Sequence, residues 1–302
     1  NNDRPGIMLA SAAKEYIRVY GVLVGKKPII FTNNDSGYDL AIDFKKNGIK
    51  PIVADIRKNS DSSVVLEAKN LNIDIRFSHG VVNSGGYKRV KYAIIGKLNS
   101  DKSGYEHLEK VSCDCICISG NWTPTVHLSS QSGNKLKFDN KIDAFIPNQS
   151  KQRENTLGSA KGLFTLNQTL NEGFNKGYEL SKKITGKDLK SSTPTSNERS
   201  YKEHEKFWCM PLPKNKNYKR CVDFQNDVYV SDIELAVREG FRSIEHVKRY
   251  TTLGMATDQG RTSNLNGLQL VSNIENKIVP EVGHTTFRPP YTPVTIGAIV
   301  GR

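Results

Sequence analysis

The chain has 302 residues, 36 % of them hydrophobic and 8 % aromatic, which suffices for two or three domains with cores and excludes general disorder. No run of 18 apolar residues occurs, so no membrane-spanning helix is expected. Its 44 Lys and Arg outnumber 31 Asp and Glu to give a net charge of +13. Because the charges are dispersed, as on a solvated surface, a nucleic-acid or acidic-partner binding module is the less favoured interpretation.

A βαβ unit is the first predicted feature along the chain. "PIIFT" (28–32) and "KPIVADI" (50–56) indicate strands, and the apolar spacing of "SGYDLAIDFKKNG" predicts a helix that Gly48 ends. In dinucleotide folds the helix start binds a pyrophosphate, and an acidic residue lies near the ribose. Here residues 33–36 (Asn33, Asn34, Asp35 and Ser36) replace the glycine fingerprint. Asp55 is therefore either a ribose ligand or an ordinary strand-end residue.

The stretch 64–98 predicts a helix, a strand and a hairpin whose turn contains Ser84, Gly85 and Gly86. The next strand carries cysteines at every second position, and alternate side chains share one face of a strand. Same-face residues lie about 6.6–7 Å apart, too far for three sulfurs to share one zinc at about 2.3 Å each. A buried strand is therefore favoured over a metal site. The three residues are Cys113, Cys115 and Cys117.

Five cysteines, an odd number, do not suit a disulfide framework and favour a reducing cytoplasmic compartment. The histidines show no metal-ligand spacing, so no metal site is expected. The histidines considered are His107, His127, His204, His246 and His284.

The glycine-rich turn 158–162 precedes an amphipathic helix and either binds an anion through its N–H groups or simply caps the helix. The polar stretch 182–205 indicates a linker. A compact helical unit follows, in which Ser231 and Glu234 form a predicted capping box and Gly240 ends the first helix. Ser243 is expected to cap a second helix. The Pro-rich end, 284–302, is expected to be extended.

Several stretches together resemble the α subunits of heterotetrameric sarcosine oxidases. They are "RPGIMLASAAKEYI", "FTNNDSGYDLA", "SGNWTPTVHLSSQSG", "VDFQNDVYVSDIELAVREGFRSIEHVKRYTTLGMATDQGRTSN" and "TTFRPPYTPV". The resemblance runs nearly end to end. It implies an internal segment of a longer subunit, which would also contain an upstream dinucleotide-binding half and a downstream aminomethyltransferase-like domain that handles tetrahydrofolate.

The fold class implied is α/β: a region like a flavoprotein with two dinucleotide-binding domains, followed by a small helical domain. The resemblance divides the chain into six parts. They are the end of the outer dinucleotide-binding domain (1–14), an inserted nucleotide-binding-like domain (15–110), a return to the outer domain (111–190), a linker (191–220), the helical domain (221–275) and an extended lead into the aminomethyltransferase-like domain (276–302).

The helical domain also resembles the [2Fe–2S] domain of bacterioferritin-associated ferredoxins. Its four cysteine positions are occupied here by Asp223, Gln225, Asp258 and Ser263. A cluster needs thiolate ligands, and Cys221 lies two residues ahead of the first position. The sequence therefore predicts that no cluster is bound.

The family resemblance implies FMN at the interface with a β subunit and NAD beside "SGNWTP". Basic, hydroxyl and amide side chains near the lost cluster suit a flavin phosphate or ring edge, although Lys248 and Arg249 also suit an ordinary helix C-terminus. The FMN candidates are Lys248, Arg249, Thr251, Thr252, Gln259, Arg261, Thr285 and Thr286, with Arg288 beside them. The NAD candidates are Gly120, Asn121, Trp122 and Pro124.

The function implied is that of an α-subunit segment in an oxidase that converts sarcosine, O2 and tetrahydrofolate to glycine, 5,10-methylenetetrahydrofolate and H2O2. The β, γ and δ subunits are the expected partners, while nucleic acid and membrane are not. FAD, zinc, tetrahydrofolate and the substrate would bind elsewhere in the complex, so no catalytic residue is expected here. The alternative is the α subunit of a related secondary-amine or imino-acid dehydrogenase.

Overall fold

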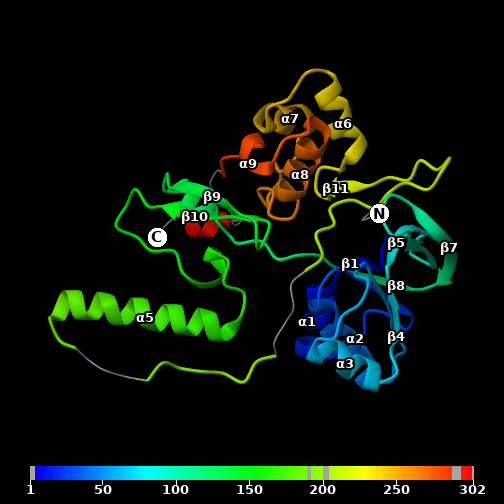
Figure 1. Cartoon of the computed structure of the whole chain (residues 1–302), viewed down its shortest axis with the longest axis horizontal. Helices are drawn as coiled ribbons and strands as arrows, with labels where there is room; N and C mark the ends of the chain where they lie inside the picture. The colour runs from blue at the N-terminus through cyan, green and yellow to red at the C-terminus, as the bar shows by residue number, and fades with distance from the viewer. Residues whose placement is uncertain (1–3, 189–191, 200–203, 288–293, 301–302) are drawn as a thin grey trace. The chain divides into compact units, whose positions relative to one another are not determined.

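The computed structural model describes residues 4–188, 192–199, 204–287 and 294–300 (Figure 1). The chain forms two compact units. Unit 1 comprises residues 1–121 and 199–221, and unit 2 comprises residues 122–198 and 222–302. The family resemblance implies domain limits at 110, 190 and 220, whereas the two units meet along the chain at 121, 198 and 221. The six implied domains stay predictions.

A parallel five-stranded sheet forms the centre of unit 1, with the order β1-β8-β2-β3-β4. The predicted βαβ unit is confirmed, and the cysteine-bearing strand β8 lies inside the sheet between β1 and β2. The strands are β1 (Ile7–Leu9), β2 (Pro28–Thr32), β3 (Ile52–Asp55), β4 (Asp74–Phe77) and β8 (Cys115–Ser119).

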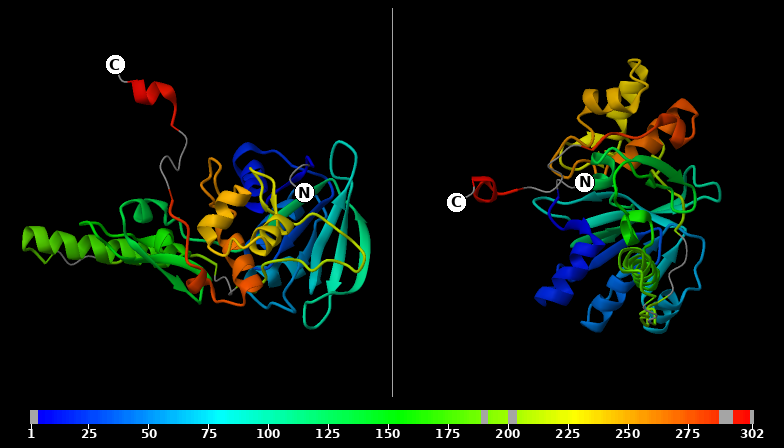
Figure 2. Two further views of the ribbon diagram at one scale, coloured as in Figure 1. Left: turned by 90° about the horizontal axis from the view of Figure 1, so that it is seen from above. Right: turned by 90° about the vertical axis from the view of Figure 1, so that its left-hand side faces the viewer.

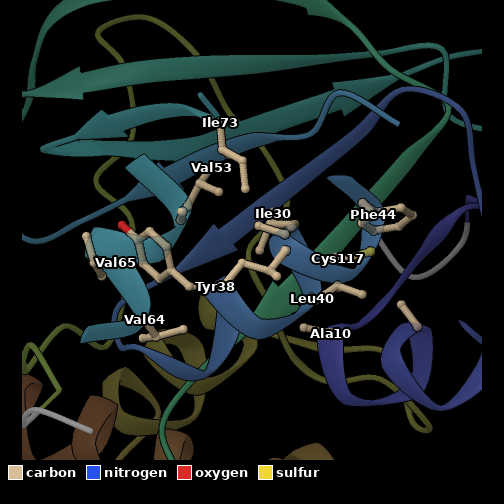
Figure 3. Close-up of a cluster of buried hydrophobic side chains, with 14 of the residues drawn as sticks. Ala10, Ile30, Tyr38, Leu40, Phe44, Val53, Val64, Val65, Ile73 and Cys117 are labelled. Atoms are coloured by element: carbon tan, nitrogen blue, oxygen red, sulfur yellow. The ribbon is translucent and has the colours of Figure 1, made fainter. Parts of the chain in front are cut away.

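Helices cover one face of this sheet, namely α1 (Ala10–Tyr20), α2 (Ser36–Lys46) and α3 (Ser63–Asn70). Figure 3 shows Tyr38, Leu40 and Phe44 of α2 packed on Ile30 and Val53 of the strands. These side chains are fully buried. Because successive strand residues point to opposite faces, the neighbours Ile29, Ala54 and Ile116 pack on the other side of the sheet.

An antiparallel sheet covers that second face and gives unit 1 three layers (Figure 2). Its strands are β5 (His79–Gly85), β6 (Tyr92–Leu98) and β7 (Tyr105–Ser112). The predicted hairpin exists, but Ser84 and Gly85 pair with β6, so its turn lies at 86–91. Gly86 is the predicted turn residue that fits, because its φ is +151° and a Cβ there would lie 2.1 Å from the Arg89 carbonyl oxygen.

Unit 2 begins with α4 (His127–Gln131) and the antiparallel pair β9 (Lys135–Asp139) and β10 (Ala144–Gln149). The predicted glycine-rich turn is a 3-10 turn, η1 (Gly158–Lys161), and the predicted amphipathic helix is α5 (Leu166–Thr185). No side chain of α5 is buried. None of the helices in the described ranges is long and apolar enough to cross a lipid bilayer.

The helical part of unit 2 packs around Ile233, Ala236, Val247 and Leu253, which are fully buried. Its elements are β11 (Cys221–Asp223), β12 (Val228–Tyr229), α6 (Val230–Arg238), α7 (Ile244–Thr251), α8 (Asn264–Glu275), α9 (Val279–Val282) and α10 (Ile296–Val300).

Two local predictions in this part were wrong. Helix α6 already begins at Val230, so Ser231 is not its cap, and the carboxylate that accepts the Tyr229 N–H at 2.8 Å is that of Asp232 rather than Glu234. The expected extended end contains the helix α10, because Pro residues stop at 293 and 296–300 are apolar and small. Gly240 follows the C-terminal cap of α6, as predicted. Ser243 is the N-cap residue of α7, as predicted.

Candidate cofactor site

The four residues at the former cluster-ligand positions lie together in unit 2. Asp223, at the end of β11, is 2 % exposed, and its carboxylate accepts the Gln225 N–H at 2.9 Å and the Gly254 N–H at 2.7 Å. The buried Ser263 hydroxyl donates to the same carboxylate at 3.4 Å. Oxygen ligands of this kind are poor partners for iron–sulfur clusters, which are held by thiolates. The residues present do not fit a [2Fe–2S] cluster.

The remaining two positions are joined in the same way. The Gln225 side-chain oxygen accepts the Asp258 N–H and the Thr257 hydroxyl, each at 3.2 Å. The Asp258 carboxylate in turn accepts the Gly260 N–H at 3.0 Å and the Thr262 hydroxyl at 3.1 Å. Hydrogen bonds accepted by two carboxylates and one side-chain amide oxygen therefore hold the loop 252–263 in place.

Asn264 is a support of this loop that the sequence analysis missed. Its side-chain nitrogen donates to the Thr285 hydroxyl at 3.1 Å and to the Gln259 carbonyl at 3.3 Å. The amide lies against Gly254 and Gly260, where a Cβ would come within 2.0 and 2.1 Å of its oxygen. Both glycines have positive φ, 65° at Gly254 and 74° at Gly260, so the loop requires glycine at both positions.

Four of the FMN candidates lie at the end of α7. Arg249 pairs with Glu245 one turn back at 3.3 Å, as expected for an exposed i,i+4 pair, and Lys248 is half-buried beside it. The Thr251 hydroxyl donates to the Val247 carbonyl at 2.7 Å, and the Thr252 hydroxyl to the Thr251 carbonyl at 2.6 Å. Because these protons are used by backbone carbonyls, the Thr251 and Thr252 hydroxyls have no proton left to donate to a phosphate.

The other four FMN candidates belong to the loop 252–263 and to the segment after α9. The Gln259 amide donates to the Ala256 carbonyl at 3.0 Å, and Thr285 is buried beneath Asn264. The Thr286 N–H donates to the Glu245 carboxylate at 3.1 Å, which ties this segment to α7. Arg261 is exposed. Arg288 lies outside the described residues.

A half-open cleft of unit 2 brings two of these candidates together with one NAD candidate. Pro124 lies on one wall, while Arg261 and Thr285 lie on another, and the space between holds about 40 Å³. Leu265 and Leu268 of α8 extend its apolar lining. Most ligand pockets combine apolar walls with a few polar groups in this way. The further lining residues, which the sequence did not indicate, are Val126, His127, Leu136, Phe145, Asn264, His284 and Phe287.

Aromatic rings form the rest of the cleft wall. The His127 and Phe287 rings stack with centroids 3.8 Å apart, and the Phe145 and His284 rings meet edge to face at 5.3 Å. Burial, with the nearby Arg261 guanidinium, lowers the pKa of His127. The imidazole is therefore neutral at physiological pH, and Arg261 supplies the positive charge at this cleft.

The NAD candidates follow β8 and span the boundary between the two units. Gly120 accepts the Asn34 side-chain N–H through its carbonyl at 2.7 Å, and Asn121 lies 3.0 Å from a ring nitrogen of His204. Both belong to unit 1. In unit 2, Trp122 is 53 % exposed and Pro124 is buried against the cleft.

The dinucleotide-like edge of unit 1 satisfies its polar groups internally. The Asp55 carboxylate accepts hydrogen bonds from the Tyr38 hydroxyl at 2.6 Å and from the Arg57 guanidinium at 2.8 Å. Arg57 also pairs with Asp35 at 2.7 Å, and all three charged side chains are at most 7 % exposed. Of the two interpretations of Asp55, this geometry favours the structural one, because its oxygens are already engaged.

The start of α2 is occupied in the same manner. The Asn34 side-chain oxygen accepts the Ser36 N–H at 2.8 Å and the Ser36 hydroxyl at 2.6 Å, at the place where a pyrophosphate would accept N–H groups. A carboxylate of the chain itself also occupies an N–H group of the glycine-rich turn in unit 2. There, the Gly158 N–H and the Lys161 ammonium both donate to the Glu172 carboxylate, at 2.8 and 2.6 Å.

The three cysteines are buried, as predicted, but the strand β8 begins at Cys115, so the prediction that Cys113 lies on the same strand was wrong. Cys115 and Cys117 face the helices and their sulfurs lie 3.5 Å apart, closer than the same-face spacing suggested, whereas Cys113 faces the antiparallel sheet. Within the described ranges, no group of three or more His, Cys, Asp or Glu side chains is arranged to hold a metal ion.

Comparison with known proteins gives three results. Residues 217–302 match the sarcosine oxidase A3 domain. Sarcosine oxidase subunit alpha of Rhizobium meliloti (strain 1021) is 34 % identical over 309 residues, covering 99 % of this chain and 29 % of the relative. The subunit alpha of Corynebacterium sp. (strain P-1) is 33 % identical over 311 residues, covering 100 % of this chain and 32 % of the relative. The chain thus spans about a third of the length of these relatives.

Among solved structures, L-proline dehydrogenase from P. horikoshii matches with a TM-score of 0.67 at 20 % identity, over 100 % of this chain and 55 % of that chain. At this identity the match shows a shared fold. It confirms the predicted α/β class.

Proposed function

The chain is homologous over its whole length to sarcosine oxidase α subunits, and on this premise we propose that it acts as part of such a subunit in a flavin-dependent oxidoreductase complex. The observation that carries the proposal is the alignment at 33–34 % identity across at least 99 % of the chain. The matched A3 domain covers the helical part of unit 2, which supplies part of the lining of the candidate cleft.

The reaction proposed for the whole complex oxidises the N-methyl group of sarcosine with O2. The methyl carbon passes to tetrahydrofolate as a methylene group, and the other products are glycine and H2O2. FAD and the sarcosine site belong to the β subunit in this proposal, with γ and δ subunits completing a cytoplasmic heterotetramer. This chain then contributes position and electrostatics, while bound flavin supplies the redox chemistry.

The cleft of unit 2 supports the assignment of one wall of an FMN site. Its apolar and aromatic lining suits a flat ring, and Arg261 places a cation at its rim. Lys248 and Arg249 lie at the end of α7, where charge-assisted donors can meet a phosphate. The remaining candidates lie in three segments: the end of α7 with Thr251 and Thr252, the loop 252–263 with Gln259, and the segment after α9 with Thr285 and Thr286. NAD is proposed to contact residues 120–124, with its main site in the outer dinucleotide-binding domain.

Co-expression with a β subunit and measurement of bound FMN tests this assignment. We expect Arg261→Met, and separately the double variant Lys248→Met/Arg249→Met, to lower FMN per complex. Arg238→Met is a matched control, because Arg238 is an exposed arginine of the same domain and lies 4.0 Å from the Glu239 carboxylate. Unchanged FMN in both test variants would remove the assignment.

A second candidate function is the α subunit of an imino-acid dehydrogenase, favoured by the fold shared with L-proline dehydrogenase. The purified complex distinguishes the two. Consumption of O2 with sarcosine, and peroxide formation, supports the oxidase. Reduction of an artificial dye with L-proline, without O2 consumption, supports the dehydrogenase.

A further inference from the structure

The carboxyl edge of the unit 1 sheet is the place where open parallel sheets bind dinucleotides. Such ligands lie in the crevice at which the strand order changes direction. In unit 1 that point lies between β2, from which the chain continues outward to β3 and β4, and β8 on its other side. Strand β2 ends there at Thr32 and is followed by Asn33, and β8 ends at Ser119 and is followed by Gly120.

A segment from much later in the sequence, residues 204–211, covers this crevice; we call it the strap. The Glu205 N–H donates to the Asn33 carbonyl at 2.9 Å, and the Asn33 amide donates to the Glu205 carbonyl at 3.0 Å. Asn33 and Glu205 are therefore joined twice, once through the backbone N–H of Glu205 and once through the side-chain amide of Asn33. Lys102 forms an ion pair with Glu205 at 2.5 Å, and the Tyr105 hydroxyl donates to the Pro211 carbonyl at 2.7 Å. The strap is thus fastened near both of its ends.

The middle of the strap fills the crevice with apolar side chains. Phe207, Trp208 and Met210 face Phe31 and Ile118 of the sheet, around a residual hollow of about 130 Å³. Gly80 of β5 makes room for this packing, because a Cβ there would lie 2.4 Å from the Met210 methyl carbon.

The polar groups that a dinucleotide would use beneath the strap are also engaged. The Asn34 side chain accepts the Ser36 N–H at the start of α2, and Arg57 pairs with Asp55 at the end of β3. Three separate features therefore fill the phosphate, ribose and ring positions with groups of the chain itself.

We propose that the strap is a built-in peptide ligand of the unit 1 crevice, which binds the chain's own residues 204–211 in place of a dinucleotide. While it is docked, the strap prevents nucleotides from binding in the crevice. It also fixes the polypeptide that leads towards the A3 domain onto the inserted sheet.

Limited trypsin digestion of the full chain, with the cut after Lys206 quantified by mass spectrometry, tests the docking. Cleavage at a docked strap follows the population in which it is released. The double variant Lys102→Ala/Tyr105→Phe removes one ion pair and one hydrogen bond, so we expect cleavage to rise about tenfold or more. Gly80→Val, which crowds Met210 without removing a polar contact, should act in the same direction.

Lys97→Ala/Tyr87→Phe is the matched control, since Lys97 pairs with Glu106 on the same antiparallel sheet away from the strap and Tyr87 is 79 % exposed. We expect cleavage after Lys206 to stay at the wild-type rate. Circular dichroism establishes that each variant is folded. Wild-type cleavage after Lys206 as fast as after the exposed Lys58 would overturn the proposal.

Fluorescence gives a second readout, because the chain has only two tryptophans. In a Trp122→Phe variant, Trp208 alone reports on the strap. We expect NAD, ATP and FMN added one at a time to leave its emission unchanged, and acrylamide to quench it more strongly in the released variants. A saturable change on adding any of these nucleotides would show a nucleotide in the crevice and refute the proposal.

Discussion

Replacement of Arg57 by methionine should strongly destabilise unit 1. The guanidinium lies 2.7 Å from Asp35 and 2.8 Å from Asp55, and both carboxylate side chains have no exposed surface. Removal of one partner from a buried ion pair typically costs about 3–5 kcal/mol, because the remaining charge is left without compensation. Here two carboxylates are left, so we expect a loss in the upper part of that range. At about 2–4 °C per kcal/mol, the melting temperature should fall by about 10 °C or more.

Urea denaturation followed by circular dichroism measures this loss. The triple variant Arg57→Met/Asp35→Asn/Asp55→Asn removes all three charges and should recover most of the stability. Arg18→Ala, which breaks an ion pair to Asp43 at a half-exposed position, should cost less than about 1 kcal/mol. A loss below about 1 kcal/mol for Arg57→Met alone would refute the reasoning that this triad is buried and self-neutralised.

Three further predictions concern the loop 252–263, the thiols and His127. Asp223→Ala removes the acceptor of the Gly254 and Gln225 N–H groups. We therefore expect faster hydrogen exchange in this loop and a loss of about 2–4 kcal/mol in unfolding free energy. Unchanged exchange would contradict the hydrogen-bond network around Asp223. The thiol reagent DTNB should react quickly with Cys209 and Cys221 alone, because the other three cysteines are buried and burial raises the pKa of Cys113 to about 12; five fast thiols in the native protein would contradict the strand assignment. The folded-state pKa of His127 is lowered, so the folded state binds fewer protons than the unfolded state and stability should decline as pH falls below about 6.5. His127→Phe, which retains the ring stack, should reduce that decline, and an identical pH profile would contradict the assignment.

The elements of unit 1 were predictable from local patterns, whereas its crevice was not. The apolar runs at 28–32 and 52–55 and the helical spacing from Ser36 fix the βαβ unit through burial alone. The strap could not be read in this way, because its partners lie in a different region of the sequence. The polar stretch 182–205 resembles a linker in composition, and only the structure shows that Glu205 pairs with Asn33.

The candidate site could likewise be predicted from the sequence only in part. The convergence of Asp223, Gln225, Asp258 and Ser263 followed from the family resemblance, and the structure brings these residues together. Asn264 and His127 were missed because an asparagine or histidine next to an apolar segment has no motif of its own. A usable signal was the pair of glycines at 254 and 260, since two glycines close to one polar residue indicate tight packing around it. The roles proposed for the FMN and NAD residues stay predictions.

The position of β8 in the sheet has a consequence for how the polypeptide is made. Among the described residues, β1 pairs only with β8, and β8 also completes one side of β2. During synthesis at about 5–20 residues per second, β1 and that side of β2 leave the ribosome well before residues 115–119 do. Exposed strand edges are prone to pair with other chains. Translation pauses between Thr32 and Cys115 should therefore increase aggregation, whereas pauses placed after Ser119 should not.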